Sequence, residues 1–237
     1  MAAPAAAYGE EDVDEDGYAH TTGYGGNGGY QHGSGYGRGG SNSGAIIING
    51  QLNLGDVWTT IKDSVNDVQH DVQGAATAVG NTAMVVTMSN TIVDNDQNQI
   101  GDVGAEVEMD VWNIGGDAVF SATALCNGAT ISTDPDVTAV NSNQNCGAMD
   151  PLASVDVHAH DVTGGVGIST TAVANQIEID SNADRFPVNN WQENVSGVYS
   201  NAVADVTGAG AVAIKASAVG NTAQIIHYPS DPTGGGY

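Results

Sequence analysis

The six residues AVGNTA occur twice in this chain of 237 residues, at Ala78–Ala83 and again at Ala218–Ala223. Each copy follows small residues and precedes a β-prone apolar segment. Glycine and asparagine tolerate positive φ better than the β-branched residues around them, so a Gly-Asn pair suits a corner between strands. We therefore interpret Asn81 and Asn221 as corner residues of a β structure and not as parts of an active site.

The same asparagine recurs between the two copies, at Asn127 and Asn175, so that the four positions are 46, 48 and 46 residues apart. An alternating segment that ends in Asp-Val, as at 107–111, recurs upstream of each. A period of this length is typical of stacked repeats. It predicts an all-β fold, a β-solenoid-like stack of about four 46-residue repeats over residues 65–228, with a β-sandwich as the alternative. The repeat corners are Asn81, Asn127, Asn175 and Asn221, whose amides could hydrogen-bond to one another as a ladder.

Residues 1–43 form a separate arm, acidic at first and then rich in glycine and tyrosine. Four successive hexads in it each start with Gly-Tyr. A segment with so much glycine buries too little apolar surface to fold alone, so we expect an arm of the disordered type. Regularly spaced tyrosines can still dock on a partner at low entropic cost. These assembly-arm residues are Tyr18, Tyr24, Tyr30 and Tyr36.

Residues 44–64 are expected to cap the repeat domain. Asn49-Gly50 lies between two apolar runs and predicts a hairpin over 46–54. The next apolar residues, within 56–65, fit a short amphipathic helix capped by Asp56, although their β-branched content also fits a strand. Residues 229–237 form a C-terminal tail.

The charge of the chain excludes two classes of partner. Four Lys and Arg residues stand against 28 Asp and Glu residues, for a formal net charge of −24. Such a chain repels phosphate backbones and anionic lipid headgroups, so we expect it to bind no nucleic acid. Because no run of about 18 apolar residues occurs, we also expect no membrane insertion.

Cys126 and Cys146 are the two cysteines of the chain. A redox or metal pair would normally have a CxxC spacing or nearby ligands, and neither is present. We therefore predict a disulfide that pins the segment between them, which favours an oxidising, extracytoplasmic location.

Four residues are weak candidates for metal ligands, and their nature makes calcium the possible cofactor. Asp94 and Asp96 lie in an oxygen-rich segment of the kind that calcium prefers. His158 and His160 lie two apart, so a strand would place both imidazoles on one face. A solvated turn and an outward polar face are the respective alternatives, and we otherwise expect no cofactor.

We find no motif of a catalytic site, neither GxSxG nor HExxH, and expect that the protein is not an enzyme. Phe186 and Trp191 lie in an insert between repeats and could together form a sugar-stacking platform. A carbohydrate-binding or carbohydrate-cleaving β-helix is therefore the alternative function, and a phage fibre protein would share the architecture.

Residues 65–228 resemble secreted bacterial surface-fibre proteins, both those with curlin-like repeats and the holdfast-anchor proteins of stalked bacteria. The resemblance rests on the two AVGNTA copies and on Ala172–Ile177. Curlin repeats also carry a glutamine ladder, but the matching positions here are Thr87 and His227, so that ladder is missing, and the repeats are about twice as long.

The resemblance implies an extracellular or cell-surface location and a structural role, as a subunit of a fibre or of a surface anchor or adhesin. We expect the chain to assemble with copies of itself into a homopolymer by end-to-end stacking of open β edges, with the arm or the hairpin over 46–54 reaching into a neighbour by strand augmentation. Polysaccharide or a cell-surface anchor is the other partner class that it suggests.

Overall fold

The computed structural model describes residues 45–88, 90–133, 138–147 and 151–228, which form ten strands and no helix. The all-β prediction is therefore confirmed for this part of the chain. The strands are β1 (Ala45–Asn53), β2 (Val57–Val68), β3 (Val72–Thr87), β4 (Thr91–Gln99), β5 (Val103–Ile114), β6 (Ala118–Thr133), β7 (Thr138–Cys146), β8 (Leu152–Ser181), β9 (Val188–Asn194) and β10 (Tyr199–His227).

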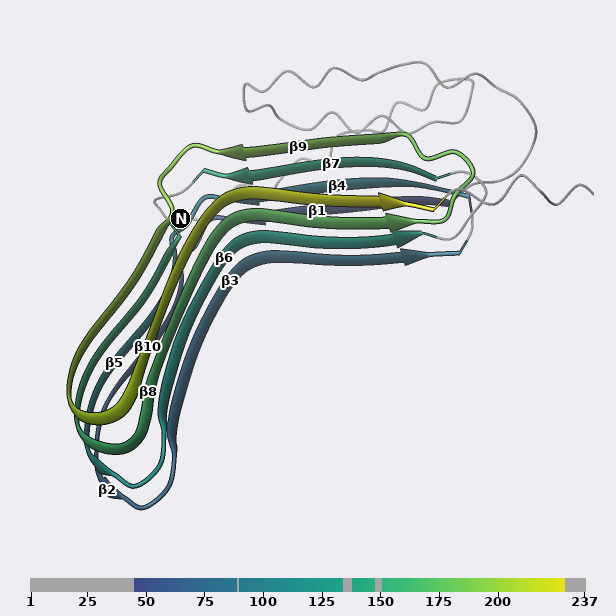
Figure 1. Cartoon of the computed structure of the whole chain (residues 1–237). Coiled ribbons are helices and arrows are strands. Elements are labelled where there is room, and N and C mark those ends of the chain that lie inside the picture. The colour runs from purple at the N-terminus through teal and green to yellow at the C-terminus, as the bar shows by residue number, and fades with distance from the viewer. Residues whose placement is uncertain (1–44, 89, 134–137, 148–150, 229–237) are drawn as a thin grey trace, which may run out of the picture. The chain divides into compact units, whose positions relative to one another are not determined.

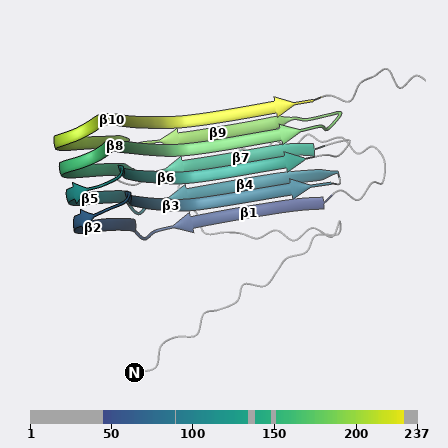
Figure 2. The ribbon, with the colours of Figure 1, turned by 60° about the horizontal axis from the view of Figure 1, so that its bottom comes forward.

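The strands pair in parallel with strands of the following stretch of chain, 46 to 48 residues later. They therefore stack in four levels, which we number from the N-terminus as 45–87, 91–133, 138–181 and 188–227 (Figures 1 and 2). A β-sandwich, the alternative from sequence, would have antiparallel sheets instead.

Each level contains three strand positions. The short strands β1, β4, β7 and β9 form one parallel sheet. The middle strands are β2, β5 and the first parts of β8 and β10, and the bent strands are β3, β6 and the second parts of β8 and β10. We call the residues at one register position in successive levels a column.

The tight corner lies between the middle and the bent strands. Asp67, Asn113 and Asp161 have φ of 58°, 55° and 56°, and Gly208 has 74°. These four residues occupy one column, so each level turns through one residue of positive φ. Asp, Asn and Gly are the residues that adopt this conformation at least cost. The column repeats every 46 to 48 residues, as the AVGNTA asparagines do.

The prediction that Asn81, Asn127, Asn175 and Asn221 turn a corner through positive φ is wrong. All four lie inside strands, and the positive-φ residues of the described chain are the corner column. The asparagines instead lie within the bent strands, whose curvature Figure 1 shows. In β6 the consecutive residues Cys126 and Asn127 are both buried, and the inward-facing residues change from even to odd numbers there. The register also skips Cys126, as expected at an irregularity.

The bend divides the interior into two apolar clusters. The larger lies between the middle strands and the first part of the bent strands, and is built mainly of Ala and Val around Phe120. The smaller lies between the short strands and the second part of the bent strands and includes Val93, Ile131 and Ile179. Small and β-branched residues fill these layers because the facing strands leave room for little else.

The predicted disulfide is confirmed. Cys126 of β6 and Cys146 of β7 are bonded, with Cα atoms 5.9 Å apart, and both residues are buried. The bond lies near the bend and joins the bent strand of level two to the short strand of level three. It therefore ties two levels of the stack together across the interior.

The predicted cap of residues 44–64 needs two corrections. The Asn49-Gly50 pair lies inside β1 and makes no hairpin, because β1 pairs along its length with β4. The segment predicted as a helix forms the strand β2, its alternative from sequence. Asp56 accepts a hydrogen bond from the backbone N of Asp102 (2.9 Å) instead of capping a helix. In both places pairing with a distant strand overrides the local preference.

Candidate assembly surfaces

The four asparagines form the expected ladder. Hydrogen bonds run from Asn81 Nδ2 to Asn127 Oδ1 (2.9 Å), from Asn127 Nδ2 to Asn175 Oδ1 (2.8 Å) and from Asn175 Nδ2 to Asn221 Oδ1 (2.8 Å). Asn127 and Asn175 each donate a second bond, to a backbone carbonyl of a neighbouring short strand, 2.9 Å and 2.7 Å long. Both amide hydrogens of these buried side chains are thus used. In every ladder bond the donor belongs to one level and the acceptor to the next level toward the C-terminus.

A glutamine ladder lies in the short strands, at a register position other than that of Thr87 and His227, where the sequence lacks glutamine. Gln97 Nε2 donates to Gln51 Oε1 (2.9 Å), Gln144 Nε2 to Gln97 Oε1 (2.8 Å) and Gln192 Nε2 to Gln144 Oε1 (2.7 Å). These bonds point toward the N-terminal end, opposite to the asparagine ladder. The recurrence of glutamine at intervals of 46 to 48 residues was the signal in the sequence that could have located it.

The stack is uncovered at level four. The inward-facing Val212, Ile214 and Ile225 of β10 are 50%, 51% and 47% exposed. Their column neighbours in β8, Val166, Ile168 and Ile179, are 2%, 3% and 0% exposed, because β10 covers them. Within the described ranges β10 pairs on one side only, with β8, and β9 only with β7. Open strand edges of this kind accept further strands.

A family model describes most of this chain. Residues 33–231 match the model of holdfast attachment protein D.

The chain belongs to the holdfast attachment protein D family.

The resemblance to holdfast-anchor proteins is thereby confirmed at the level of the family. Membership gives the protein a role in surface attachment and a location at the cell surface. The part of the chain that the structure describes contains no helix long and apolar enough to cross a bilayer. A search of curated proteins and a search of solved structures each returned no match.

The candidate metal ligands of this holdfast attachment protein lie on outer faces of the stack. Asp94 accepts a hydrogen bond from Asn141 (3.0 Å) and Asp96 one from Asn143 (3.1 Å), so both carboxylates belong to polar columns of the short strands. Among the described residues no group of three His, Cys, Asp or Glu side chains is arranged to hold a metal ion.

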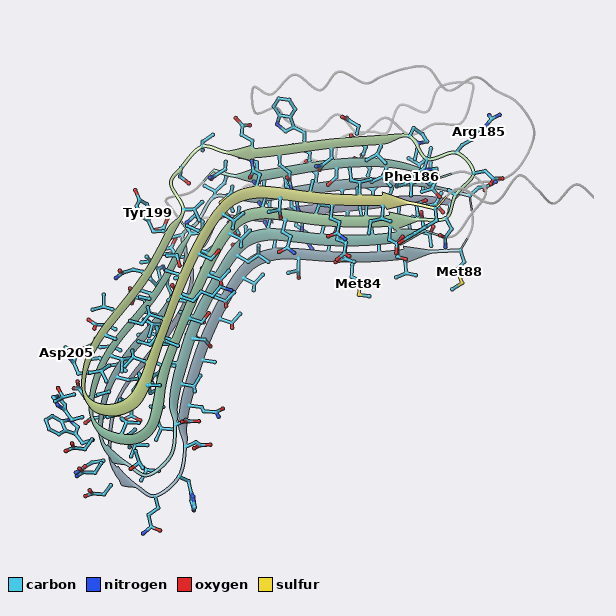
Figure 3. All side chains as sticks on the ribbon, viewed as in Figure 1. Met84, Met88, Arg185, Phe186, Tyr199 and Asp205 are labelled. Carbon is cyan, nitrogen blue, oxygen red and sulfur yellow. A yellow bond between two sulfur atoms is a disulfide. The ribbon has the colours of Figure 1, made fainter. Side chains whose placement is uncertain are left out.

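The two candidate histidines share one face of β8 but have different partners. His158 lies 4.0 Å from Asp156 and 3.9 Å from Asp205, whose side chain projects outward from β10 in Figure 3. The ring of His160 stacks on that of Trp112, with centroids 3.9 Å apart and planes at 22°. The structure therefore does not bring the two imidazoles together on one ligand.

The two insert aromatics do not form one platform. Phe186 packs against the smaller core cluster and lies near His227, with ring centroids 5.6 Å apart (Figure 3). Trp191 is 63% exposed on the outer side of β9. A sugar ring stacked on Trp191 would therefore not contact Phe186. The four arm tyrosines lie outside the described residues.

One ion pair joins levels one and two on the outer face of the middle strands. Lys62 Nζ lies 2.7 Å from Glu108 Oε1. This hydrogen bond and the negative charge of Glu108 raise the pKa of Lys62 above its ordinary value. Both side chains are exposed, so the pair adds little to stability.

The glycines of the two AVGNTA copies should respond differently to the same substitution. A Cβ atom at Gly80 would overlap the carboxamide of Gln99 and the backbone carbonyl of Cys126, whereas one at Gly220 meets nothing within 4 Å. Gly80→Ala is expected to lower the free energy of unfolding by about 2 kcal/mol because it overpacks this contact. Gly220→Ala is the matched control and should have almost no effect. Urea unfolding of dilute protein measures both, and equal effects would contradict the close approach at Gly80.

Proposed function

We propose that this holdfast attachment protein is a non-catalytic structural subunit of an extracellular anchor or fibre. In this proposal residues 45–228 are a β-solenoid of four repeats that assembles with further copies through its open strand edges. No cofactor is part of the proposal. The observation that carries it is the half-exposed apolar interior at level four, built from Val212, Ile214 and Ile225.

The repeat interpretation is supported by four features with the same period. Parallel pairing, the asparagine ladder, the glutamine ladder and the column of positive φ all recur at intervals of 46 to 48 residues. Each level covers the apolar layer of the one before it. In stacked architectures the terminal units carry a polar outer face when the protein stays monomeric, and level four does not.

Assembly through edges is supported by the chemistry of the uncovered strands. The free edges of β9 and β10 present backbone donors and acceptors in the register of a parallel sheet. A strand from another chain that pairs there would satisfy these groups and cover the apolar side chains in one step. The arm, residues 1–43, is proposed to contribute by strand augmentation.

The proposed location is outside the cell, which agrees with the disulfide between Cys126 and Cys146. We propose polysaccharide or another cell-surface component as the partner that the assembled protein contacts besides its own copies. We do not place that contact on Phe186 and Trp191, because Phe186 packs into the core cluster while Trp191 faces outward.

Charged residues at the uncovered, inward-facing positions of level four should prevent assembly without unfolding the chain. In the double variant Ile214→Asp and Ile225→Asp, both carboxylates stay hydrated in the monomer, because these positions are about half exposed. In an assembly they would be buried without partners, which costs several kcal/mol. We expect filaments of the full chain in electron microscopy and none from the variant, with little change in thermal unfolding.

The matched control is Val203→Asp, which adds a carboxylate at an outward position of the same strand that is 44% exposed. It should assemble as the unchanged protein does. Filaments from the double variant, or an unchanged protein that stays monomeric at every concentration tested, would contradict the proposed function.

A further inference from the structure

We infer that two copies join with level four of one on level one of the next, in register, so that one AVGNTA segment pairs with the other. This inference rests on the proposed function and specifies its contact. Within the chain, the end of each bent strand is followed by the start of the next short strand. The end of β10 and the start of β1 occupy these same two register positions. Such a joint therefore continues the order of strands found within the chain.

The bent strands of the two end levels are more alike than those of neighbouring levels. Residues 76–83 read ATAVGNTA and residues 216–223 read ASAVGNTA, whereas the intervening levels read ATALCNGA at 122–129 and TTAVANQI at 170–177. Within one chain the two similar segments are separated by two levels and do not touch. A joint between copies makes them adjacent, which accounts for the repetition of these residues at the two ends.

Both amide ladders end with complementary groups. Asn221 donates to the backbone carbonyl of Gln192 (3.2 Å) and has one further amide hydrogen, while among the described residues no level precedes Asn81 to supply a donor to its Oδ1. In the opposite direction, Gln51 donates to the carbonyl of Thr82 (2.6 Å) and has a second amide hydrogen, while Gln192 Oε1 ends its ladder. The joint therefore supplies a donor for an acceptor in both columns, as the levels within the chain do.

An exposed tryptophan matches an open glycine across the joint. Within the chain, the ring of Trp58 at level one occupies the space where Gly104 of level two would carry a Cβ. Trp191 at level four occupies the column of Gly50, where a Cβ would meet nothing within 4 Å. In the joint Trp191 lies over Gly50 of the next copy, in the same direction along the stack as Trp58 over Gly104.

The uncovered apolar side chains also find partners. In register, Val212 lies on Val72 of the next copy, Ile214 on Gly74 and Ile225 on Val85, as the columns of levels three and four continue.

One residue opposes the joint: Asp63 occupies the column of the buried Met109 and Val157. Inward-facing charges limit uncontrolled pairing of open edges. We expect Asp63→Val to lower the concentration at which the joint forms.

Cross-linking between two variants of the full chain, each with one added cysteine besides the Cys126–Cys146 disulfide, tests the register. Thr82→Cys and Thr222→Cys place thiols at outward, exposed positions that the joint makes adjacent, at the spacing of paired strands. An equimolar mixture treated with a short bifunctional thiol reagent should give covalent dimers. The control mixture, Thr82→Cys with Gln224→Cys, is displaced by two residues and should give several-fold fewer dimers. Thr82→Cys alone should give no covalent dimers, because dimers from this variant would require level one of one copy to contact level one of another.

A second pair of variants tests the joint without a reagent. Gly50→Val has open space in the single chain, so it should fold normally, yet it collides with Trp191 in the joint. It should raise the concentration needed for assembly by about tenfold, and adding Trp191→Ala to it should restore most of that loss. Assembly with displaced or head-to-head cross-links, or no effect of Gly50→Val, would overturn the joint and leave the proposed function standing. Absence of any assembly would refute the proposed function itself.

Discussion

Replacing Asn127 by alanine is expected to lower the free energy of unfolding by about 4 kcal/mol. The side chain is fully buried and takes part in three hydrogen bonds, two as donor and one as acceptor. Its removal leaves groups of Asn81, Asn145 and Asn175 without a partner in the interior, and each such group costs about 1–3 kcal/mol. Urea unfolding of the dilute, unassembled protein, followed by circular dichroism, measures the loss.

The control is Asn141→Ala on the outer face of β7. Asn141 also belongs to a ladder, since it donates to Asp94 (3.0 Å) and accepts from Asn189 (2.9 Å), but these bonds are exposed to water. Water replaces the lost partners there, so a change below about 1 kcal/mol is expected. A similar loss of unfolding free energy at Asn127 and Asn141 would show that burial does not determine how much the ladder hydrogen bonds stabilise the fold.

Removal of the disulfide is the other large effect that we expect. The bond closes a segment with a sequence separation of 20, which on the chain-entropy model stabilises the fold by about 3 kcal/mol. The double variant Cys126→Ala and Cys146→Ala should therefore unfold at a temperature lower by about 6–12 °C. Differential scanning calorimetry of the variant, beside the unchanged protein with and without a reductant, provides the measurement.

The position of the bond across two levels leads to a further expectation. Because Cys126 belongs to level two and Cys146 to level three, its loss should loosen the contact between these levels first. Hydrogen exchange should increase most at the bend of β6 and the end of β7. An unchanged unfolding temperature in the variant would mean that packing alone holds these two levels together.

The short strands show why part of the candidate surface could not be predicted. Asn49-Gly50 is a strong local signal for a hairpin turn, yet it lies in β1, where Asn49 donates to Asn95 (2.7 Å). Trp191 was placed with Phe186 because they are close in sequence, but they face different sides of the sheet. Local preferences amount to about 1 kcal/mol, and pairing along a whole parallel strand outweighs them.

The sequence by itself determined the period, the β class and the asparagine ladder, because these depend on residue types that recur at a fixed spacing. It also determined the disulfide, because the chain has two cysteines with neither a CxxC spacing nor nearby ligands. Only the tertiary structure decided which column carries the turn, since Asp67, Asn113, Asp161 and Gly208 share a backbone conformation and not a residue type. It also decided that the Asn49-Gly50 pair lies inside β1 and not in a turn. A strand's neighbours are set by burial and register over some 46 residues, which local sequence does not contain.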